Sequence, residues 1–304
     1  MYIKKANQEA NKYLIVCDLD GTLLNNNSEL SSRTIHTIKT LIEMGNIFCI
    51  ATGRTIAGAL RYYDQLGLDT LMSNLDGSVI TNPKDPKFTP LNFTFNKNIL
   101  FNIFSSKKII DKIELAIVET HDQCIFINNE NTKPDLKRNQ ELLQFLGVRP
   151  TRDGSYSSEI NFNGKITDVK DDLYSLLFLL EDDHDLDEIA NRIKDVAGTL
   201  SVNNWELNDH RGIVVSISSV FASKLTALKF FSSYYGIKLE NCIVFGDSNN
   251  DVTMLQKAGY SFAMKNANVS AKLAAKYIAR ITNDQDGVAL ELEKLFYLNE
   301  CDIE

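Results

Sequence analysis

Long apolar runs and an excess of basic residues are both missing from this sequence of 304 residues. No stretch of eighteen or more apolar residues occurs, so no segment is expected to cross a membrane as a helix. Lys and Arg number 32 against 40 Asp and Glu, which gives a formal net charge of −8. Nucleic acid and anionic membrane surfaces are bound through clustered basic faces, so neither kind of partner is expected.

Paired cysteines are missing too. The five cysteines are scattered, odd in number and never spaced as CxxC. This usage is typical of a reducing compartment, and it offers no thiolate zinc site. A secretory signal has an apolar core, which the polar segment MYIKKANQEANKY does not provide. We therefore expect a cytoplasmic protein.

Both ends of the chain alternate strand-like apolar runs with amphipathic, helix-like stretches. The expected strands are 13–17, 47–51, a third from 71, then 242–245, 261–263 and 278–281. The expected helices are about 32–44, 55–66, 224–235, 252–258, 269–276 and 288–298. Such alternation is typical of a parallel sheet with crossover helices. We expect the two ends to be halves of one sheet.

The middle of the chain has a different character. Asn82-Pro83 and Asp85-Pro86 interrupt the alternation, and a mixed region runs from there to about Ser218. The apolar run Leu173–Leu180 fits either a buried strand or a buried helical segment. We expect residues 87–218 to form an inserted second domain, with 1–86 and 219–304 forming the core.

Polar residues follow the apolar runs at places where chemistry is expected. These are Asp18-Leu19-Asp20-Gly21-Thr22, Thr52-Gly53-Arg54, Lys224 at a helix start, and Gly246-Asp247-Ser248-Asn249-Asn250-Asp251. Each segment alone has a simpler structural interpretation, such as a capped turn, a helix cap or a solvated charge. Ligands of an open parallel sheet bind beyond the carboxyl ends of its strands, so the shared location favours a single site.

Together these residue types predict a phosphoryl-transfer site. Several carboxylates in one cleft repel each other and need a cation, and oxygen ligands suit Mg²⁺. A carboxylate can attack phosphorus and form an acyl phosphate. Lysine, metal and loop donors neutralise the phosphoryl charge. A second acid two residues further along can protonate the leaving oxygen and later deprotonate water.

These motifs resemble those of the haloacid-dehalogenase superfamily, specifically its Cof-type sugar-phosphate phosphatases. The matching segments are Asp18–Leu24, Ala51–Arg54, Ser223-Lys224 and Gly246–Leu255. The resemblance implies an α/β fold with a Rossmann-like, doubly wound parallel-sheet core and an inserted α+β cap domain of the C2 type. It also implies a Mg²⁺-dependent phosphomonoester hydrolase acting on small phosphorylated metabolites such as sugar phosphates.

The same resemblance implies residue roles. Asp18 would be the nucleophile and Asp20 the general acid and base. The groups that would hold the phosphoryl group are Thr52, Gly53, Lys224 and Asn250. The groups that would hold Mg²⁺ are Asp18, the backbone carbonyl of Asp20, Asp247 and Asp251.

The sequence also departs from the Cof pattern. Asp76-Gly77-Ser78 stands where these proteins usually read Asn-Gly-Ala, and Phe221 and Leu225 replace glycines on either side of Lys224. No carboxylate of the motifs is affected, so the expected reaction class is unchanged.

Two alternatives remain at this stage. A phosphotransferase or mutase of the same superfamily would use the same acyl phosphate and return the phosphoryl group to a sugar. A non-catalytic phosphate sensor would keep the group on Asp18, but the neighbouring acid Asp20 argues against that role. No segment of the sequence marks an oligomer interface.

Overall fold

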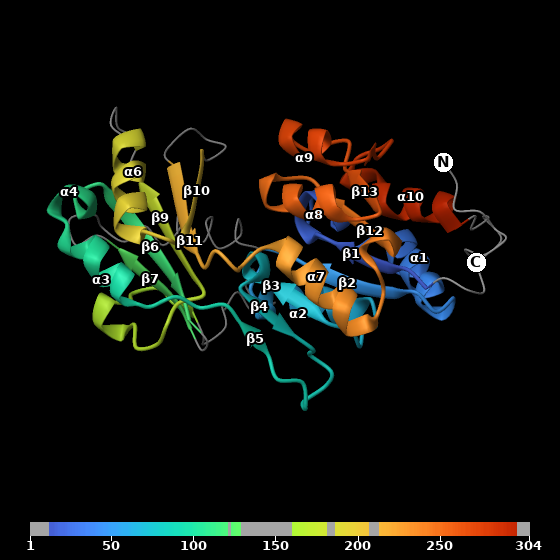
Figure 1. Ribbon diagram of the computed structural model, residues 1–304, viewed down its shortest axis with the longest axis horizontal. Coiled ribbons are helices and arrows are strands. Elements are labelled where there is room, and N and C mark those ends of the chain that lie inside the picture. Colours follow the sequence, from blue (N-terminus) through green and yellow to red (C-terminus); the bar gives the residue numbers. More distant parts are fainter. Residues whose placement is uncertain (1–11, 121–122, 129–159, 181–185, 207–212, 297–304) are drawn as a thin grey trace. The chain divides into compact units, whose positions relative to one another are not determined.

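A computed structural model describes residues 12–120, 123–128, 160–180, 186–206 and 213–296 (Figure 1). The chain divides into two compact units. The first comprises Met1–Leu91 and Ser223–Glu304, and the second comprises Asn92–Ala222. Among the residues described, none of the helices is long and apolar enough to cross a membrane.

The first unit is built on an eight-stranded sheet in the order β14-β13-β12-β1-β2-β3-β4-β5. Its strands are β1 (Leu14–Cys17), β2 (Ile47–Ala51), β3 (Met72–Asn74), β4 (Val79–Thr81), β5 (Leu91–Asn92), β12 (Cys242–Gly246), β13 (Tyr260–Ala263) and β14 (Tyr277–Ile278). The strands from β14 to β3 pair in parallel, and β4 runs antiparallel to β3. The fold is therefore α/β with a parallel-sheet core.

The direction in which the chain winds reverses beside β1. From β1 the chain proceeds through β2 to β3 on one side, whereas β12, β13 and β14 proceed outward on the other. The loops that follow β1 and β12 consequently diverge, which leaves room for a ligand at the carboxyl ends of these two strands. Both strands are buried along their whole length, as expected for central strands covered on both faces.

In the part of the first unit that the structure describes, six helices connect or cover these strands. They are α1 (Ser32–Glu43), α2 (Ile56–Gln65), α7 (Lys224–Tyr235), α8 (Val252–Lys257), α9 (Val269–Ala274) and α10 (Gly287–Phe296). Helix α1 packs against α10, and α7 packs against α8 (Figure 1). Short turns lie at η2 (Leu19–Leu23), η3 (Leu75–Gly77), η5 (Leu239–Asn241), η6 (Asn249–Asp251) and η7 (Asn283–Gln285).

Local capping explains where the helix that carries Lys224 begins and ends. The Ser223 hydroxyl accepts a hydrogen bond from the Thr226 amide at 3.0 Å, which satisfies one of the unpaired donors of the first turn. Gly236 ends the helix with a left-handed φ of +65°. The prediction of a helix over 224–235 is confirmed.

Two predictions for the first unit need correction. The strand expected over 278–281 is β14, which ends at Ile278. The amide of Arg280 donates to the Glu291 carboxylate at 3.0 Å, so it is not available to a strand ladder. The helix expected over 269–276 ends at Ala274.

The second unit contains a six-stranded sheet in the order β10-β11-β9-β6-β7-β8. Its strands are β6 (Ile113–Glu119), β7 (Cys124–Asn128), β8 (Ile160–Asn161), β9 (Ser175–Leu180), β10 (Ser201–Glu206) and β11 (Ile213–Ser218). All neighbours except β7 and β8 pair antiparallel. The open choice for Leu173–Leu180 is resolved in favour of a strand, β9.

Helices cover one face of this second sheet. They are α3 (Asn98–Ser105), α4 (Lys107–Ile110) and α6 (Leu186–Ala197). A short turn, η4 (Ile166–Asp168), lies between β8 and β9 in the sequence. Leu100, Ile109 and Ile193 project from the three helices into one apolar core with residues of the strands. This unit is an α+β layer with its own core.

Candidate active site

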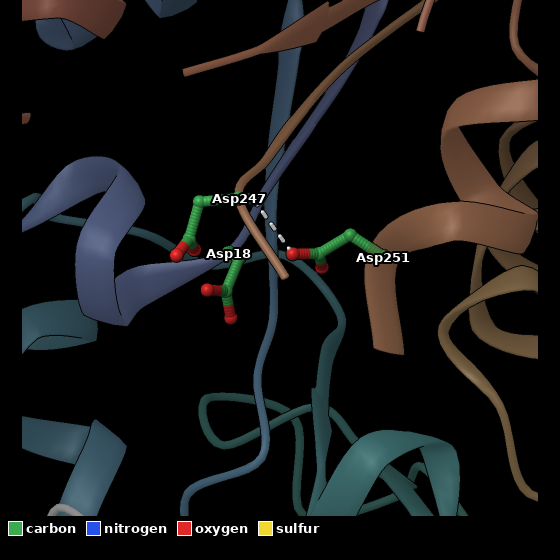
Figure 2. A group of neighbouring side chains, drawn as sticks. All are labelled: Asp18, Asp247 and Asp251. Atoms are coloured by element: carbon green, nitrogen blue, oxygen red, sulfur yellow. Dashed lines mark hydrogen bonds between the residues drawn. The ribbon is translucent and has the colours of Figure 1, made fainter. Parts of the chain in front are cut away.

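Three carboxylates converge at the point where the winding of the first sheet reverses. Asp18 directly follows β1, and Asp247 directly follows β12. The two loops start side by side because Cys17 pairs with Phe245 and the Asp18 amide donates to the Phe245 carbonyl at 3.2 Å. Asp251 comes from η6, and Figure 2 shows its side chain directed toward the other two. One oxygen of each of the three lies within 4.8 Å of the others.

Lys224 provides the positive charge of this cluster. Its ammonium group is fully buried and lies 2.7 Å from Asp18 Oδ1 and 2.7 Å from Asp251 Oδ1. A buried lysine at the first position of α7 is therefore shared between two carboxylates. The structure brings Lys224 and Asp18 together across 206 residues of sequence.

Asp251 has both carboxylate oxygens occupied. Its Oδ1 accepts from Lys224, and its Oδ2 accepts from the amides of Asp247 and Ser248 at 2.8 and 3.0 Å. Asp251 thus holds the loop after β12 in shape. Asp247 is oriented separately by the Thr22 hydroxyl, which donates to its Oδ1 at 2.9 Å.

Burial of three carboxylates around one ammonium group changes their protonation. Burial raises the pKa of Asp18 well above its ordinary value; Lys224 opposes this shift, whereas Asp251 and Asp247 add to it. Burial, together with Asp251, raises the pKa of Asp247 to about 7. For Lys224, burial acts to lower the pKa, but Asp18 and Asp251 hold it well above its ordinary value.

The cluster has the chemistry of a divalent-cation site. Asp18, Asp247 and Asp251 carry three negative charges when ionised, and Lys224 supplies one positive charge. All the candidate ligand atoms are carboxylate oxygens, which hard divalent cations prefer. The pKa values of Asp18 and Asp247 are both raised, so a further cation beside them would help both carboxylates to stay ionised.

Asp20 is placed differently from the other acids. Its side chain is 50% exposed and is held by Arg54, whose Nε donates to Oδ2 at 2.6 Å and whose Nη2 donates to Oδ1 at 2.5 Å. The Arg54 side chain is only 2% exposed, and its Nη1 also donates to the Tyr62 hydroxyl at 3.3 Å. This two-point contact fixes the direction of the Asp20 carboxylate.

The loop after β2 is fixed by hydrogen bonds to the turn after β3. Thr52 is buried, and its hydroxyl accepts from the Arg54 amide at 3.1 Å. The Thr52 carbonyl accepts from the Asp76 amide at 3.1 Å. A Cβ atom on Gly53 would lie 3.2 Å from the Asp76 carboxylate, so Gly53 faces that side chain. Asn250 is exposed, and its side-chain amide donates to Asp76 at 2.8 Å.

Three of these contacts were not expected from the sequence. No role for Arg54, Thr22 or Asp76 was expected, although each belongs to or adjoins a motif. Arg54 and Asp20 are 34 residues apart, and Asp76 and Asn250 are 174 residues apart. A signal for Arg54 existed in the sequence, because a charged residue directly follows the Thr-Gly pair at the end of an apolar strand.

Comparisons with known proteins show which proteins this chain is similar to. A family model described as haloacid dehalogenase-like hydrolase matches residues 15–292. The 5-amino-6-(5-phospho-D-ribitylamino)uracil phosphatase YitU of Bacillus subtilis is 28% identical over 296 residues, which cover 95% of this chain and 100% of that protein. The phosphatase YwtE of the same organism, which has the same substrate in its name, is 23% identical over 295 residues, covering 92% and 97%.

A solved structure shares the fold. It is a haloacid dehalogenase-like hydrolase from Bacteroides thetaiotaomicron, with a TM-score of 0.73 and 23% sequence identity. The superposition covers 94% of this chain and 100% of that one.

Proposed function

Because this chain belongs to the haloacid dehalogenase-like hydrolases and is a phosphatase, we propose that it hydrolyses small phosphate monoesters through an acyl phosphate on Asp18, with Mg²⁺ as cofactor. The observation that carries the proposal is the contact between the buried Lys224 ammonium and both Asp18 and Asp251, beside the Asp247 carboxylate. A nucleophilic carboxylate held against a cation at the end of a central strand suits attack on an anionic phosphoryl group.

In this proposal the metal would be held by Asp18 and Asp247, together with the backbone carbonyl of Asp20, with Asp251 as support. When bound, Mg²⁺ would neutralise carboxylate charge and the charge of the phosphoryl oxygens. Lys224 keeps one Asp18 oxygen in a fixed direction, which leaves the other oxygen of the same carboxylate for attack on phosphorus.

The phosphoryl group would be held by four groups of the protein. These are the Thr52 hydroxyl, the Gly53 amide, the Lys224 ammonium and the Asn250 side-chain amide. Their donors would stabilise charge on the phosphoryl oxygens as the bond to the leaving oxygen breaks.

Asp20 would transfer the protons. In the first step it would protonate the leaving oxygen, and in the second it would deprotonate the water that attacks the acyl phosphate on Asp18. Arg54 would act as a positioning residue for Asp20, because it holds both oxygens of that carboxylate.

Similarity to named relatives supports the substrate class that we propose. Two relatives have 5-amino-6-(5-phospho-D-ribitylamino)uracil phosphatase as their name, so phosphate esters of sugars and sugar alcohols, this one included, are the first compounds to test. We propose that residues 87–218 form an inserted cap domain that selects the leaving group. We also propose a cytoplasmic location.

Release of inorganic phosphate from a panel of such esters tests the proposal, with Mg²⁺, with EDTA, and with the Asp18→Asn variant. Hydrolysis that requires Mg²⁺ and is lost in the variant is the expected result. Transfer of the phosphoryl group to a second sugar without release of free phosphate would favour a phosphotransferase or mutase. No turnover of any ester by a folded protein would favour a phosphate sensor.

A further inference from the structure

The carboxylate of Asp76 lies beside the candidate active site but has no part in the proposed reaction. Asp76 belongs to η3, where Leu75, Asp76 and Gly77 have left-handed φ values of +50°, +52° and +96°. Such backbone is costly for Leu and is retained where surrounding contacts enforce it. Here the Leu75 and Asp76 amides donate to the carbonyls of Arg54 and Thr52, both at 3.1 Å. The turn is therefore fixed to the loop that carries the proposed phosphoryl donors.

The Asp76 carboxylate faces that loop. Its oxygens lie 3.2 and 3.5 Å from the position that a Cβ atom on Gly53 would take. Burial raises the pKa of Asp76, while Lys224 and the hydrogen bond from Asn250 act to lower it. A negative charge at this place repels an anionic substrate and weakens its binding, unless the carboxylate positions another side chain that binds the substrate.

Asn250 is that other group. Its Nδ2 donates to Asp76 Oδ1 at 2.8 Å, and its Oδ1 accepts from the Ser248 hydroxyl at 2.8 Å. A hydroxyl can donate or accept, so Ser248 is compatible with either orientation of the amide. An ionised carboxylate can only accept, so Asp76 is compatible with one orientation, in which the NH₂ group points toward it.

We propose that Asp76 is a positioning residue that fixes the orientation of the Asn250 side-chain amide and so directs its second N–H to the phosphoryl group. This inference rests on the proposed function, in which Asn250 contacts the phosphoryl oxygens. Asp76 takes one N–H of the NH₂ group, and the other remains for the ligand. Without the carboxylate the amide can rotate and present its oxygen to an anionic phosphoryl oxygen, which is repulsive.

Removal of the Asp76 carboxylate has opposite effects on phosphate binding, depending on whether Asp76 acts through its charge or through Asn250. If Asp76 acted mainly as a negative charge near the ligand, its removal would strengthen phosphate binding. If it acts by orienting Asn250, its removal weakens phosphate binding, and the loss disappears once Asn250 is truncated.

A double-mutant cycle separates these outcomes. Asp76→Ala, Asn250→Ala and the double variant are compared with the wild type at pH 8 with Mg²⁺. The affinity for inorganic phosphate is measured by calorimetry, and KM and kcat are measured with p-nitrophenyl phosphate. Asp64→Ala is the matched control, because it also removes one carboxylate from the first unit, but one that forms an exposed ion pair with Lys84 at 2.7 Å.

We expect each single variant and the double variant to bind phosphate about tenfold more weakly than the wild type, the usual effect of one hydrogen bond to a charged group. KM should rise in parallel, with a smaller change in kcat, and Asp64→Ala should match the wild type. Losses that add in the double variant, or tighter phosphate binding by Asp76→Ala, would overturn the inference.

Failure of the proposed function gives a different result. A wild-type protein that binds phosphate but hydrolyses no ester contradicts the proposed reaction, and the calorimetric cycle still decides the role of Asp76. A wild-type protein that does not bind phosphate overturns the inference itself.

Discussion

Arg54 and Asp20 form an ion pair with very unequal exposure. The guanidinium group is 2% exposed and the carboxylate 50% exposed. The arginine is further fixed by the Tyr62 hydroxyl and by the Gly58 carbonyl, at 3.3 and 3.4 Å. A half-exposed carboxylate is thereby held by a buried partner, which keeps a proton donor within reach of one position.

Arg54→Gln is therefore predicted to affect substrates according to their leaving groups. For an alkyl phosphate, whose leaving oxygen must be protonated, we expect kcat/KM to fall about 10- to 100-fold, the usual contribution of general acid catalysis. For p-nitrophenyl phosphate, whose leaving group departs unprotonated, a fall of less than about threefold is expected, since kcat/KM reports the first chemical step.

The control for this comparison is Arg33→Gln, which removes another short ion pair of the first unit, that with Glu293. It should leave the ratio between the two substrates unchanged, and Asp20→Asn should shift it in the same direction as Arg54→Gln. An equal loss for both esters in Arg54→Gln would mean that Arg54 does not act through Asp20.

The bounds of a helix or strand can be predicted from the sequence when the residues that end it are its neighbours in the chain. The helix Lys224–Tyr235 has its predicted bounds, and the residues that cap it, Ser223 and Gly236, adjoin it in sequence. The strand expected to 281 ended early because Glu291, on α10, takes the amide of Arg280. The partners of Arg54 and Asp76 could not be predicted either. They lie on loops that are distant in sequence and that the sheet brings together.

The location of the candidate site could also be predicted, whereas its individual side-chain contacts could not. Carboxylates after β1 and β12 were expected to meet, because parallel strands end at one edge of a sheet. The sequence did not indicate that Lys224 would also contact Asp251, or that both oxygens of Asp251 would be used by Lys224 and two amides. Such pairings depend on side-chain directions in three dimensions.

Gly77 links two elements of the site, the turn η3 and the start of α7. A Cβ atom at Gly77 would lie 2.3 Å from the Ser223 carbonyl oxygen, and the glycine has a φ of +96°. Gly77→Ala is expected to lower the free energy of unfolding by about 2–4 kcal/mol. The backbone at Ser223 must move to make room for the Cβ atom, and the alanine must adopt a strained φ. It should also reduce phosphatase activity per folded molecule, since Ser223 precedes Lys224.

Gly236→Ala is the matched variant. Its φ is +65°, but nothing lies within 4 Å of an added Cβ atom, so only the backbone strain of about 1 kcal/mol is expected. Urea unfolding and activity assays of both variants test the comparison. Equal losses of stability, or full activity in folded Gly77→Ala, would contradict a steric link between η3 and α7.

At the scale of the whole molecule, the net charge of −8 opposes an anionic substrate. Attraction must therefore come from the site itself, where Lys224 is already shared between Asp18 and Asp251. The charge that remains to be balanced is that of the carboxylates, and under the proposed function a bound metal ion would balance it.

The free energy of unfolding should depend on both pH and Mg²⁺. The folded-state pKa of Asp247 is about 7, above its ordinary value of 3.8, so between these values the native state holds more protons than the unfolded state. The free energy of unfolding in EDTA should therefore fall as pH rises through this window, by an amount of the order of 2 kcal/mol from this site. Mg²⁺ favours the ionised carboxylates and should oppose the fall.

The measurement is thermal or urea unfolding at pH 5 and pH 7.5, with EDTA and with Mg²⁺, for the wild type and Asp247→Asn. At a concentration of 100 times its dissociation constant, Mg²⁺ should add about 2.7 kcal/mol at pH 7.5 and much less at pH 5, where protons compete for Asp18 and Asp247. Other carboxylates contribute their own pH dependence, so the informative quantity is the difference between wild type and variant. A Mg²⁺ effect that is the same at both pH values, or unchanged in Asp247→Asn, would mean that the ion binds elsewhere.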